Sequence, residues 1–487
     1  MTPNDSHIFV QALSARDARF DGVFFVGITT TRIYCRPVCP SRAARNQHRR
    51  FFSSAAAAET AGFRPCLRCR PELAPGCALC DAVSRLASTA VHRISAGALN
   101  ERSVGQLASE LGVSERHLRR ALDREIGVSP VELAQTHRLL LAKRLLADTR
   151  LSVTTIAFAS GFQSLRRFNS VFRERYGLSP TSLRQGRVAR SQSHERDTVA
   201  LTLAYRPPLA WDALVALLRA DAITGVEVAE ENRYARTVRI DGRTGVIVAE
   251  NASGNVKIDV SLSLLPVLMP LLARLRHLFD LDAEPATVDT RLEQGGLQSL
   301  VAQRRGLRLL GTFDAFELVL RALLAGRARP GAGSNAVVAR VFSALGQPIE
   351  TGIASLSHLA PTADRIAEAG PARLKDLGVA SRRADAISRV ARIVADGQLR
   401  LEPGSDALGS RDALIEIDGI SDRLATTIVM RALRWPDAFP ASDVSLQRAA
   451  GVPNMRSLLD RAEDWRPWRA YAALHLWING EDRPCAP

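Results

Sequence analysis

The chain has 487 residues, of which 46% are hydrophobic and 24% charged, and it carries a formal net charge of +15. This length predicts about three domains or slightly more. No apolar stretch reaches membrane-spanning length without charges, and the N-terminus lacks a basic segment followed by an apolar one. We therefore expect a soluble, cytoplasmic protein rather than a secreted or membrane protein.

The positive charge is concentrated in the first part of the chain. Residues 1–187 hold 28 Lys and Arg against 14 Asp and Glu, whereas residues 188–487 hold 37 against 36. A strongly basic region is the electrostatic signature of nucleic-acid binding. The first part is thus predicted to bind DNA through charge, and the second only through local geometry.

Four cysteines are the most informative feature of residues 1–81. They form two close pairs with the spacing C-x3-C-x26-C-x2-C: Cys35, Cys39, Cys66 and Cys69. Four sulfur ligands in this pattern can close a tetrahedron around Zn²⁺, and most such sites are structural. Cys77 and Cys80 form a third pair, so spacing leaves open a site built from residues 66, 69, 77 and 80. Nearby arginines are expected to lower the thiol pKa values and to attract phosphate.

The phrases Ile33-Tyr34-Cys35-Arg36-Pro37 and Gly62-Phe63-Arg64-Pro65-Cys66 resemble the zinc-binding N-terminal domain of the Ada family. The resemblance implies that Cys35 is both a zinc ligand and the acceptor of a methyl group from a DNA methylphosphotriester. It makes Cys39, Cys66 and Cys69 the other ligands, and it leaves the third pair as free thiols or a minor metal site. Its expected contacts to the DNA backbone are Thr31, Arg42 and Arg64.

Residues 82–187 contain a repeated helical pattern. Each copy has a short helix, a turn with glycine at positive φ and a longer helix, and each closes with Gly-x-Ser-Pro. Leu118, Leu122, Phe168 and Phe172 supply the buried face at helical spacing. The pair resembles the double helix-turn-helix domain of AraC-type regulators, which implies two recognition helices in successive major grooves. The expected DNA contacts are Arg116, Arg119, Arg120, Arg166, Arg167 and Asn169.

Residues 188–198 are polar and are predicted to be a linker. Four strand-like segments follow, and then an apolar helix at 264–279; from about residue 287 the pattern is almost wholly helical. The strand-like segments are 226–229, 237–240, 245–249 and 257–260.

Residues 199–480 resemble the AlkA type of 3-methyladenine DNA glycosylase, a helix-hairpin-helix protein that flips a damaged base out of the duplex. The phrases at 205–211, 314–317, 435–443 and 465–471 carry this likeness. It implies that Asp443 stabilises the positive charge that develops on the deoxyribose. The resemblance also places Trp477 at the position of an aromatic residue that lines the base pocket. Asp443 on its own is more often a helix N-cap, and Trp465, Trp468, Tyr471 and Trp477 could be core residues.

Two segments depart from that family. The hairpin reads Asp418-Gly419-Ile420-Ser421, where Ser421 replaces a glycine and Asp418 and Asp422 add negative charge. In that family, the region that matches residues 325–331 inserts an apolar side chain into the gap that the flipped base leaves in the duplex. Residues 325–331 offer no such side chain, although Arg327 could substitute for it. Gly419 and Ser421 remain the expected phosphate contacts of the hairpin.

We therefore predict a multidomain protein: an α+β zinc domain at 1–81, an all-α double helix-turn-helix at 82–187, a linker at 188–198, an α+β AlkA N-terminal-like domain at 199–310 and an all-α helix-hairpin-helix glycosylase domain at 311–487. The predicted function is a Zn²⁺-dependent sensor of methylphosphotriesters and transcription regulator fused to a 3-methyladenine glycosylase. The alternative is a regulator whose second half only binds DNA. Double-stranded DNA is the expected partner, and we expect a monomer. Full-length members of the Ada family carry a second methyl acceptor, used on O6-methylguanine, in a Pro-Cys-His-Arg motif. This chain has no such motif, so repair of O6-methylguanine is not expected.

Overall fold

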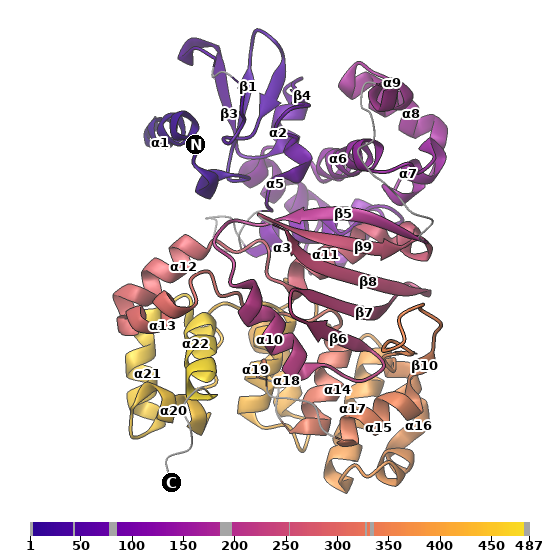
Figure 1. The fold of residues 1–487 in the computed structure, drawn as a ribbon, viewed down its shortest axis with the longest axis vertical. Coiled ribbons are helices and arrows are strands. Elements are labelled where there is room, and N and C mark those ends of the chain that lie inside the picture. The colour runs from indigo at the N-terminus through magenta and orange to yellow at the C-terminus, as the bar shows by residue number, and fades with distance from the viewer. Residues whose placement is uncertain are drawn as a thin grey trace.

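Short strands and the helices α1 and α2 form the N-terminal part of the computed structural model (Figure 1). The structure describes residues 3–41, 44–76, 85–185, 197–252, 254–326, 329–331 and 336–481. The sheet has the order β3-β1-β2-β4, with β1 antiparallel to β2 and β3, and β2 parallel to β4. The elements are α1 (Pro3–Ala15), η1 (Ala18–Phe20), β1 (Phe25–Ile28), β2 (Ile33–Cys35), η2 (Asn46–His48), β3 (Arg49–Phe52), α2 (Ala55–Thr60), β4 (Arg64–Pro65) and η3 (Pro71–Leu73).

The next part is helical and contains the predicted repeat. Gly112 and Gly161 adopt φ values of +69° and +84° between the short and long helices of each unit. Ser114 and Ser164 cap the long helices by accepting backbone N–H groups three residues ahead. The helices are α3 (Arg85–Ser95), α4 (Val104–Glu110), α5 (Glu115–Ile126), α6 (Pro130–Asp148), α7 (Val153–Ala159), α8 (Leu165–Tyr176) and α9 (Pro180–Gln185). The repeated helix-turn-helix is confirmed, whereas the predicted linker lies almost entirely outside the described residues.

An antiparallel five-stranded sheet of order β5-β9-β8-β7-β6 occupies the middle of the molecule. Each predicted strand-like segment overlaps one of its strands. The helix expected at 264–279 begins instead as a 3₁₀ turn, which contains Pro266. The elements are β5 (Thr198–Ala204), α10 (Trp211–Asp221), β6 (Glu227–Glu230), β7 (Arg233–Ile240), β8 (Arg243–Ala252), β9 (Asn255–Ser261), η4 (Leu262–Val267) and α11 (Leu268–Leu278).

The remainder is helical as predicted, apart from one two-stranded hairpin, β10 (Gln347–Pro348) and β11 (His358–Leu359). Among the described residues, no helix combines the length and apolarity needed to cross a membrane. The helices are α12 (Pro285–Leu292), η5 (Glu293–Leu297), α13 (Gln298–Gln303), α14 (Ala315–Ala325), α15 (Ala336–Leu345), α16 (Ala363–Asp376), α17 (Ser381–Ala395), α18 (Ala407–Ile415), α19 (Asp422–Ala432), α20 (Val444–Ala450), α21 (Met455–Ala462), η6 (Glu463–Trp465) and α22 (Arg469–Glu481).

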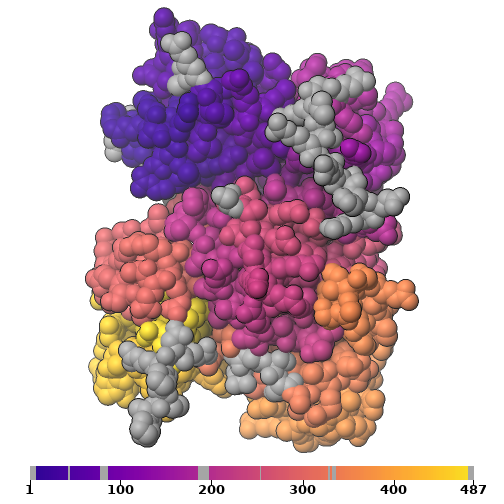
Figure 2. Space-filling model, in the orientation of Figure 1, coloured from indigo at the N-terminus to yellow at the C-terminus, as the bar shows by residue number. Residues whose placement is uncertain are grey.

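The two halves of the chain share one hydrophobic core. Leu145 of α6, Phe168 of α8, Leu201 of β5 and Trp477 of α22 belong to the same cluster of buried side chains. Figure 2 shows the indigo and purple surface of the N-terminal part lying directly against the magenta surface of the middle part. Burial of this much apolar surface makes docking of the two halves an intrinsic part of folding.

Ionic contacts fasten the N-terminal part to α6. Arg70, the residue after Cys69, donates hydrogen bonds of 2.7 Å to each carboxylate oxygen of Asp148. Glu72 accepts from Lys143 and lies 3.0 Å from Arg70, and the Glu72 and Lys143 side chains are each 1% exposed. A buried carboxylate left without its partner would be costly, so this pair constrains how the two parts meet.

We predict that Lys143→Met lowers the free energy of unfolding by about 3 kcal/mol, because it leaves the Glu72 carboxylate buried with only Arg70 beside it. Urea unfolding of the full chain measures this loss. The matched control is Lys375→Met, whose ion pair with Asp385 is roughly half exposed and whose loss should cost at most about 1 kcal/mol. Equal losses in the two variants would contradict the prediction.

Candidate metal centre and DNA-facing sites

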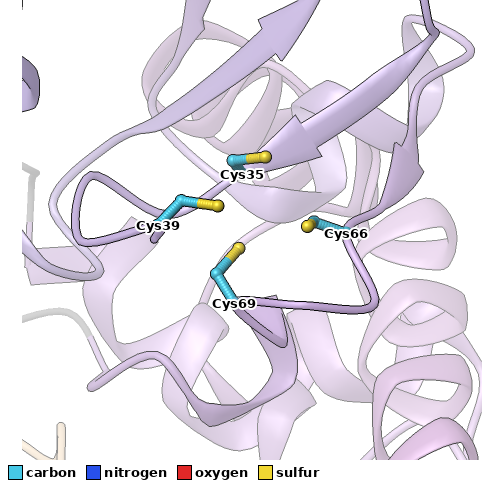
Figure 3. Close-up of side chains that lie close together, drawn as sticks. All are labelled: Cys35, Cys39, Cys66 and Cys69. Carbon is cyan, nitrogen blue, oxygen red and sulfur yellow. The ribbon is translucent and has the colours of Figure 1, made fainter. Parts of the chain in front are cut away.

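The four predicted cysteines come together at one edge of the small sheet. Parallel pairing of β2 with β4 places Cys35, at the end of β2, beside Cys66, which directly follows β4; the Cys66 N–H donates to the Tyr34 carbonyl at 2.9 Å. Cys39 follows a turn after β2, and Cys69 comes two residues before η3. The four sulfurs lie within 4.8 Å of one another and point toward a common centre (Figure 3). Metal–sulfur bonds of about 2.3 Å require sulfurs about 3.8 Å apart, so the set fits a tetrahedral ion.

The four thiols differ in their access to solvent. Cys39, Cys66 and Cys69 are buried, whereas Cys35 is partly exposed. Backbone N–H groups of Arg36 and Arg68 approach the sulfurs of Cys69 and Cys66 at 3.4 and 3.3 Å. Cys35 is therefore the ligand that an external reactant can reach.

The thiol pKa values are governed by the neighbouring sulfurs. The hydrogen bond with Cys35 lowers the pKa of Cys66 to about 6, and hydrogen bonding within the cluster raises the pKa of Cys35. Two of the arginines that were expected to lower these pKa values are engaged elsewhere. The guanidinium of Arg36 binds the Asp21 carboxylate and the Cys69 carbonyl, and that of Arg70 binds Asp148, so these positive charges are already compensated.

The predicted DNA-backbone contacts of this part are only partly described. Thr31 and Arg64 are exposed, and the Arg64 N–H donates to the Arg32 carbonyl at 2.8 Å, which brings both residues to the same end of the sheet. Arg42, Cys77, Cys80 and Cys485 lie outside the described residues. The role of the third cysteine pair and the contact of Arg42 therefore stay predictions.

The two long helices of the repeat present basic residues to solvent. Leu118, Leu122, Phe168 and Phe172 are fully buried, as predicted. Arg119 is paired with Glu115 at 2.6 Å, and Asn169 is half-buried. Four arginines of the predicted set are exposed without an ion pair to a described residue: Arg116, Arg120, Arg166 and Arg167. These four are the best placed to meet DNA phosphates or bases.

Asp443 is the N-cap of α20 and is 6% exposed. Its Oδ1 accepts the Ser445 N–H at 2.8 Å and the Ser445 hydroxyl at 2.6 Å. Its Oδ2 lies 3.6 Å from Nη1 of Arg423. The capping interpretation of the sequence is thus confirmed, and it coexists with an ionic partner that the sequence did not reveal.

The aromatic residues of the C-terminal part lie in the core. Trp465 and Trp477 are 0% and 2% exposed, and Trp468 and Tyr471 are each 5% exposed. Tyr471 donates its hydroxyl to Asp280 at 2.6 Å. The core interpretation of these side chains is confirmed, and a role for Trp477 in a base pocket stays a prediction.

The residues of the hairpin between α18 and α19 depart from the family pattern but suit the backbone conformation that they adopt. Ser421 has φ −78° and caps α19 by accepting the Leu424 N–H, so the position needs no glycine. Gly419 has φ +98°, which only glycine adopts readily. Asp418 pairs with Arg382 at 2.6 Å, and Asp422 pairs with Arg411. Serine at position 421 therefore does not disturb the backbone, and the two carboxylates are paired rather than free negative charges, which corrects both expectations. Arg327 lies outside the described residues.

Sequence reasoning missed a buried carboxylate behind Cys35. Glu59 of α2 is 1% exposed and accepts hydrogen bonds from the Tyr34 hydroxyl at 3.1 Å and the Thr136 hydroxyl at 3.2 Å. It thereby links the strand that carries Cys35 to α6. A glutamate in an alanine-rich helix resembles an ordinary surface residue, so no local pattern could have identified it.

Four family models match the chain, and together they span most of it. They are the metal binding domain of Ada over residues 9–72, a helix-turn-helix domain over 107–186, the AlkA N-terminal domain over 200–314 and the HhH-GPD superfamily of base excision DNA repair proteins over 332–453. Their order confirms the multidomain fold class.

A Mycobacterium tuberculosis protein named probable bifunctional transcriptional activator/DNA repair enzyme AlkA is 36% identical over 478 residues, which are 97% of this chain and 96% of that protein. The chain belongs to this AlkA family. Two Escherichia coli proteins match parts of it. DNA-3-methyladenine glycosylase 2 is 32% identical over 57% of this chain and 96% of its own length. The Ada activator/repair enzyme is 32% identical over 36% of this chain and 48% of its own length.

We predict that Glu59 makes the free energy of unfolding of this AlkA-family chain depend on pH. Burial raises the pKa of Glu59 from 4.5 to about 7. Between these values the unfolded chain releases a proton that the folded chain keeps, so stability falls as pH rises from about 4.5 to 7. Glu59→Gln removes this loss and retains hydrogen bonding to Tyr34 and Thr136. We expect the variant to be more stable than wild type at pH 8 by up to about 3 kcal/mol.

Urea unfolding at pH 4 and pH 8 measures this difference, which should vanish at the lower pH. Glu368→Gln, at an exposed position of α16, is the matched control and should follow the wild-type pH curve. Parallel curves for wild type and Glu59→Gln would contradict the assignment.

Proposed function

We propose that the chain is a bifunctional alkylation-damage response protein, in which residues 1–187 sense methylated DNA phosphates and regulate transcription while the remainder excises alkylated bases. The exposure of Cys35 beside three buried cysteines is the observation that carries the sensing role. A purely structural site has no need for one accessible ligand. Residues 1–81, 82–187, 199–310 and 311–487 are the proposed domains.

Zn²⁺ is the proposed metal, and Cys35, Cys39, Cys66 and Cys69 would hold it. Bound zinc would keep the Cys35 sulfur deprotonated at neutral pH. The sulfur then attacks the methyl carbon of a methylphosphotriester. A C–S bond forms as the C–O bond breaks, and the electron pair returns to the phosphate oxygen. Cys35 becomes a neutral thioether, and the phosphate regains its negative charge.

This reaction also supplies a regulatory signal. The negative charge at the cysteine cluster falls by one unit, which weakens its repulsion from DNA phosphates. Thr31, Arg42 and Arg64 are the proposed phosphate contacts beside it. The exposed arginines of α5 and α8 would then bind promoter DNA, with Asn169 and Arg119 as further contacts.

We predict that purified protein binds one zinc ion and that Cys35→Ala abolishes methyl uptake from duplex DNA carrying methylphosphotriesters. Mass spectrometry of the wild-type chain should locate the methyl group on Cys35. Cys39→Ala is the comparison: like Cys35→Ala it removes one zinc ligand, so both variants should hold zinc less tightly, and the position of the methyl group in the wild-type chain distinguishes the acceptor from the other ligands. A methyl group on Cys77 or Cys80 would contradict the assignment.

The second half is proposed to be a 3-methyladenine-type DNA glycosylase. Its likeness over 280 residues to a protein named DNA-3-methyladenine glycosylase 2 favours an active enzyme over a module that only binds DNA. Asp443 would stabilise the positive charge on the deoxyribose as the glycosidic bond breaks. Gly419 and Ser421 would direct backbone N–H groups to a DNA phosphate, and Trp477 would support the base pocket. The proposed setting is a cytoplasmic monomer on double-stranded DNA.

We predict that Asp443→Asn lowers single-turnover excision of 3-methyladenine or 7-methylguanine from alkylated duplex DNA by about a hundredfold or more. Asparagine keeps the cap but loses the charge, so folding should be preserved. The full chain in excess over DNA is the proper assay. If wild type and Asp443→Asn are equally inert, the second half is not a glycosylase.

A further inference from the structure

The two oxygens of Asp443 have different surroundings. Ser445 holds Oδ1 through its N–H and its hydroxyl, while Oδ2 faces the guanidinium of Arg423 at 3.6 Å. Arg423 is the second residue of α19, the helix that follows the hairpin. The proposed catalytic carboxylate is thus accompanied by a fixed positive charge that comes from the proposed DNA-binding hairpin.

Arg423 is also the more accessible member of the pair. Its side chain is 37% exposed, against 9% for the side chain of Asp443. The guanidinium therefore lies on the solvent side of the pair, whereas the carboxylate is almost enclosed. Because the guanidinium lies 3.6 Å from the carboxylate, a base that departs from a sugar held beside that carboxylate would experience its charge as well.

The charge of the departing base depends on the lesion. In every case the bond between C1′ and the base nitrogen breaks, its electron pair leaves with the base, and water supplies hydroxyl to C1′; the remaining proton of that water passes to solvent or to an anionic departing base. A purine methylated at N3 or N7 starts as a cation and leaves neutral. A neutral modified purine, such as hypoxanthine, leaves with negative charge until it gains a proton. A neighbouring guanidinium stabilises the second transition state and opposes the positive charge of the first substrate.

We infer that Arg423 is a specificity-determining residue that favours neutral modified purines over cationic methylated ones. The inference rests on the proposed glycosylase function. It assigns to Arg423 a role in choosing among lesions, whereas Asp443 serves all of them.

The test compares Arg423→Gln, Arg423→Lys and wild type in single-turnover release of 7-methylguanine and of hypoxanthine from duplex oligonucleotides. The ratio of the two rates should shift about tenfold toward 7-methylguanine in Arg423→Gln, and should stay within about threefold of wild type in Arg423→Lys, which keeps the charge. Arg448→Gln is the matched control, because it removes an exposed arginine from the neighbouring helix α20 and should change both rates by the same factor. An unchanged ratio in Arg423→Gln, with both rates lowered together, would overturn the inference.

A second measurement separates this inference from the proposed function. If wild type releases neither base, the glycosylase proposal fails, and the charge at residue 423 is then tested by binding. The probes are duplexes with a cationic pyrrolidine or a neutral tetrahydrofuran in place of the nucleoside. Arg423→Gln should raise the affinity ratio of pyrrolidine to tetrahydrofuran about tenfold, and an unchanged ratio would contradict the placement of the cation.

Discussion

The apolar core that runs from α6 through the sheet β5–β9 into α22 is the constraint on which the rest of the structure depends. It joins Leu145, Leu201 and Trp477 in one buried cluster, so the regulator-like and glycosylase-like halves cannot separate without exposing it. Helix α6 adds the polar contacts. Thr136 meets Glu59 near one end of the helix, and Lys143 and Asp148 meet Glu72 and Arg70 near the other. The helix that separates the two DNA-binding repeats is therefore in direct contact with Arg70, the residue after the ligand Cys69, and with Glu59, which binds Tyr34 beside Cys35.

Local patterns predicted the elements well because each rests on short-range physics. The cysteine spacing identified the cluster, the positive-φ glycines and the closing Gly-x-Ser-Pro motifs identified the repeated helix-turn-helix, and strand-like segments located the central sheet. Asp443 was found from its family motif and as a cap. Its partner Arg423 lies 20 residues away on another helix, and Glu59 lies 77 residues from Thr136. No spacing rule reaches such contacts, because tertiary packing alone brings these residues together.

The hairpin shows why counting charges along the sequence gave a misleading expectation about phosphate binding. Asp418 and Asp422 resemble obstacles to phosphate binding when they are read as free charges. In the folded chain Arg382 and Arg411 pair with them, so the local charge is close to neutral. Exposed ion pairs of this kind are weak and are readily rearranged. A DNA phosphate that approaches the hairpin can therefore compete with the carboxylates for the same guanidinium groups.

The two proposed reactive side chains share one electrostatic design. Cys35 is the accessible member of a buried sulfur cluster, and Asp443 is a nearly buried carboxylate beside a more exposed arginine. In each case buried neighbours hold the reactive group in place, and at least one polar group of the site is accessible from solvent. A reactive charge that is held by the fold requires little reorganisation when the substrate binds. In this proposal, selectivity depends on the more exposed groups beside each reactive side chain: the proposed phosphate contacts around Cys35 and the guanidinium of Arg423 beside Asp443.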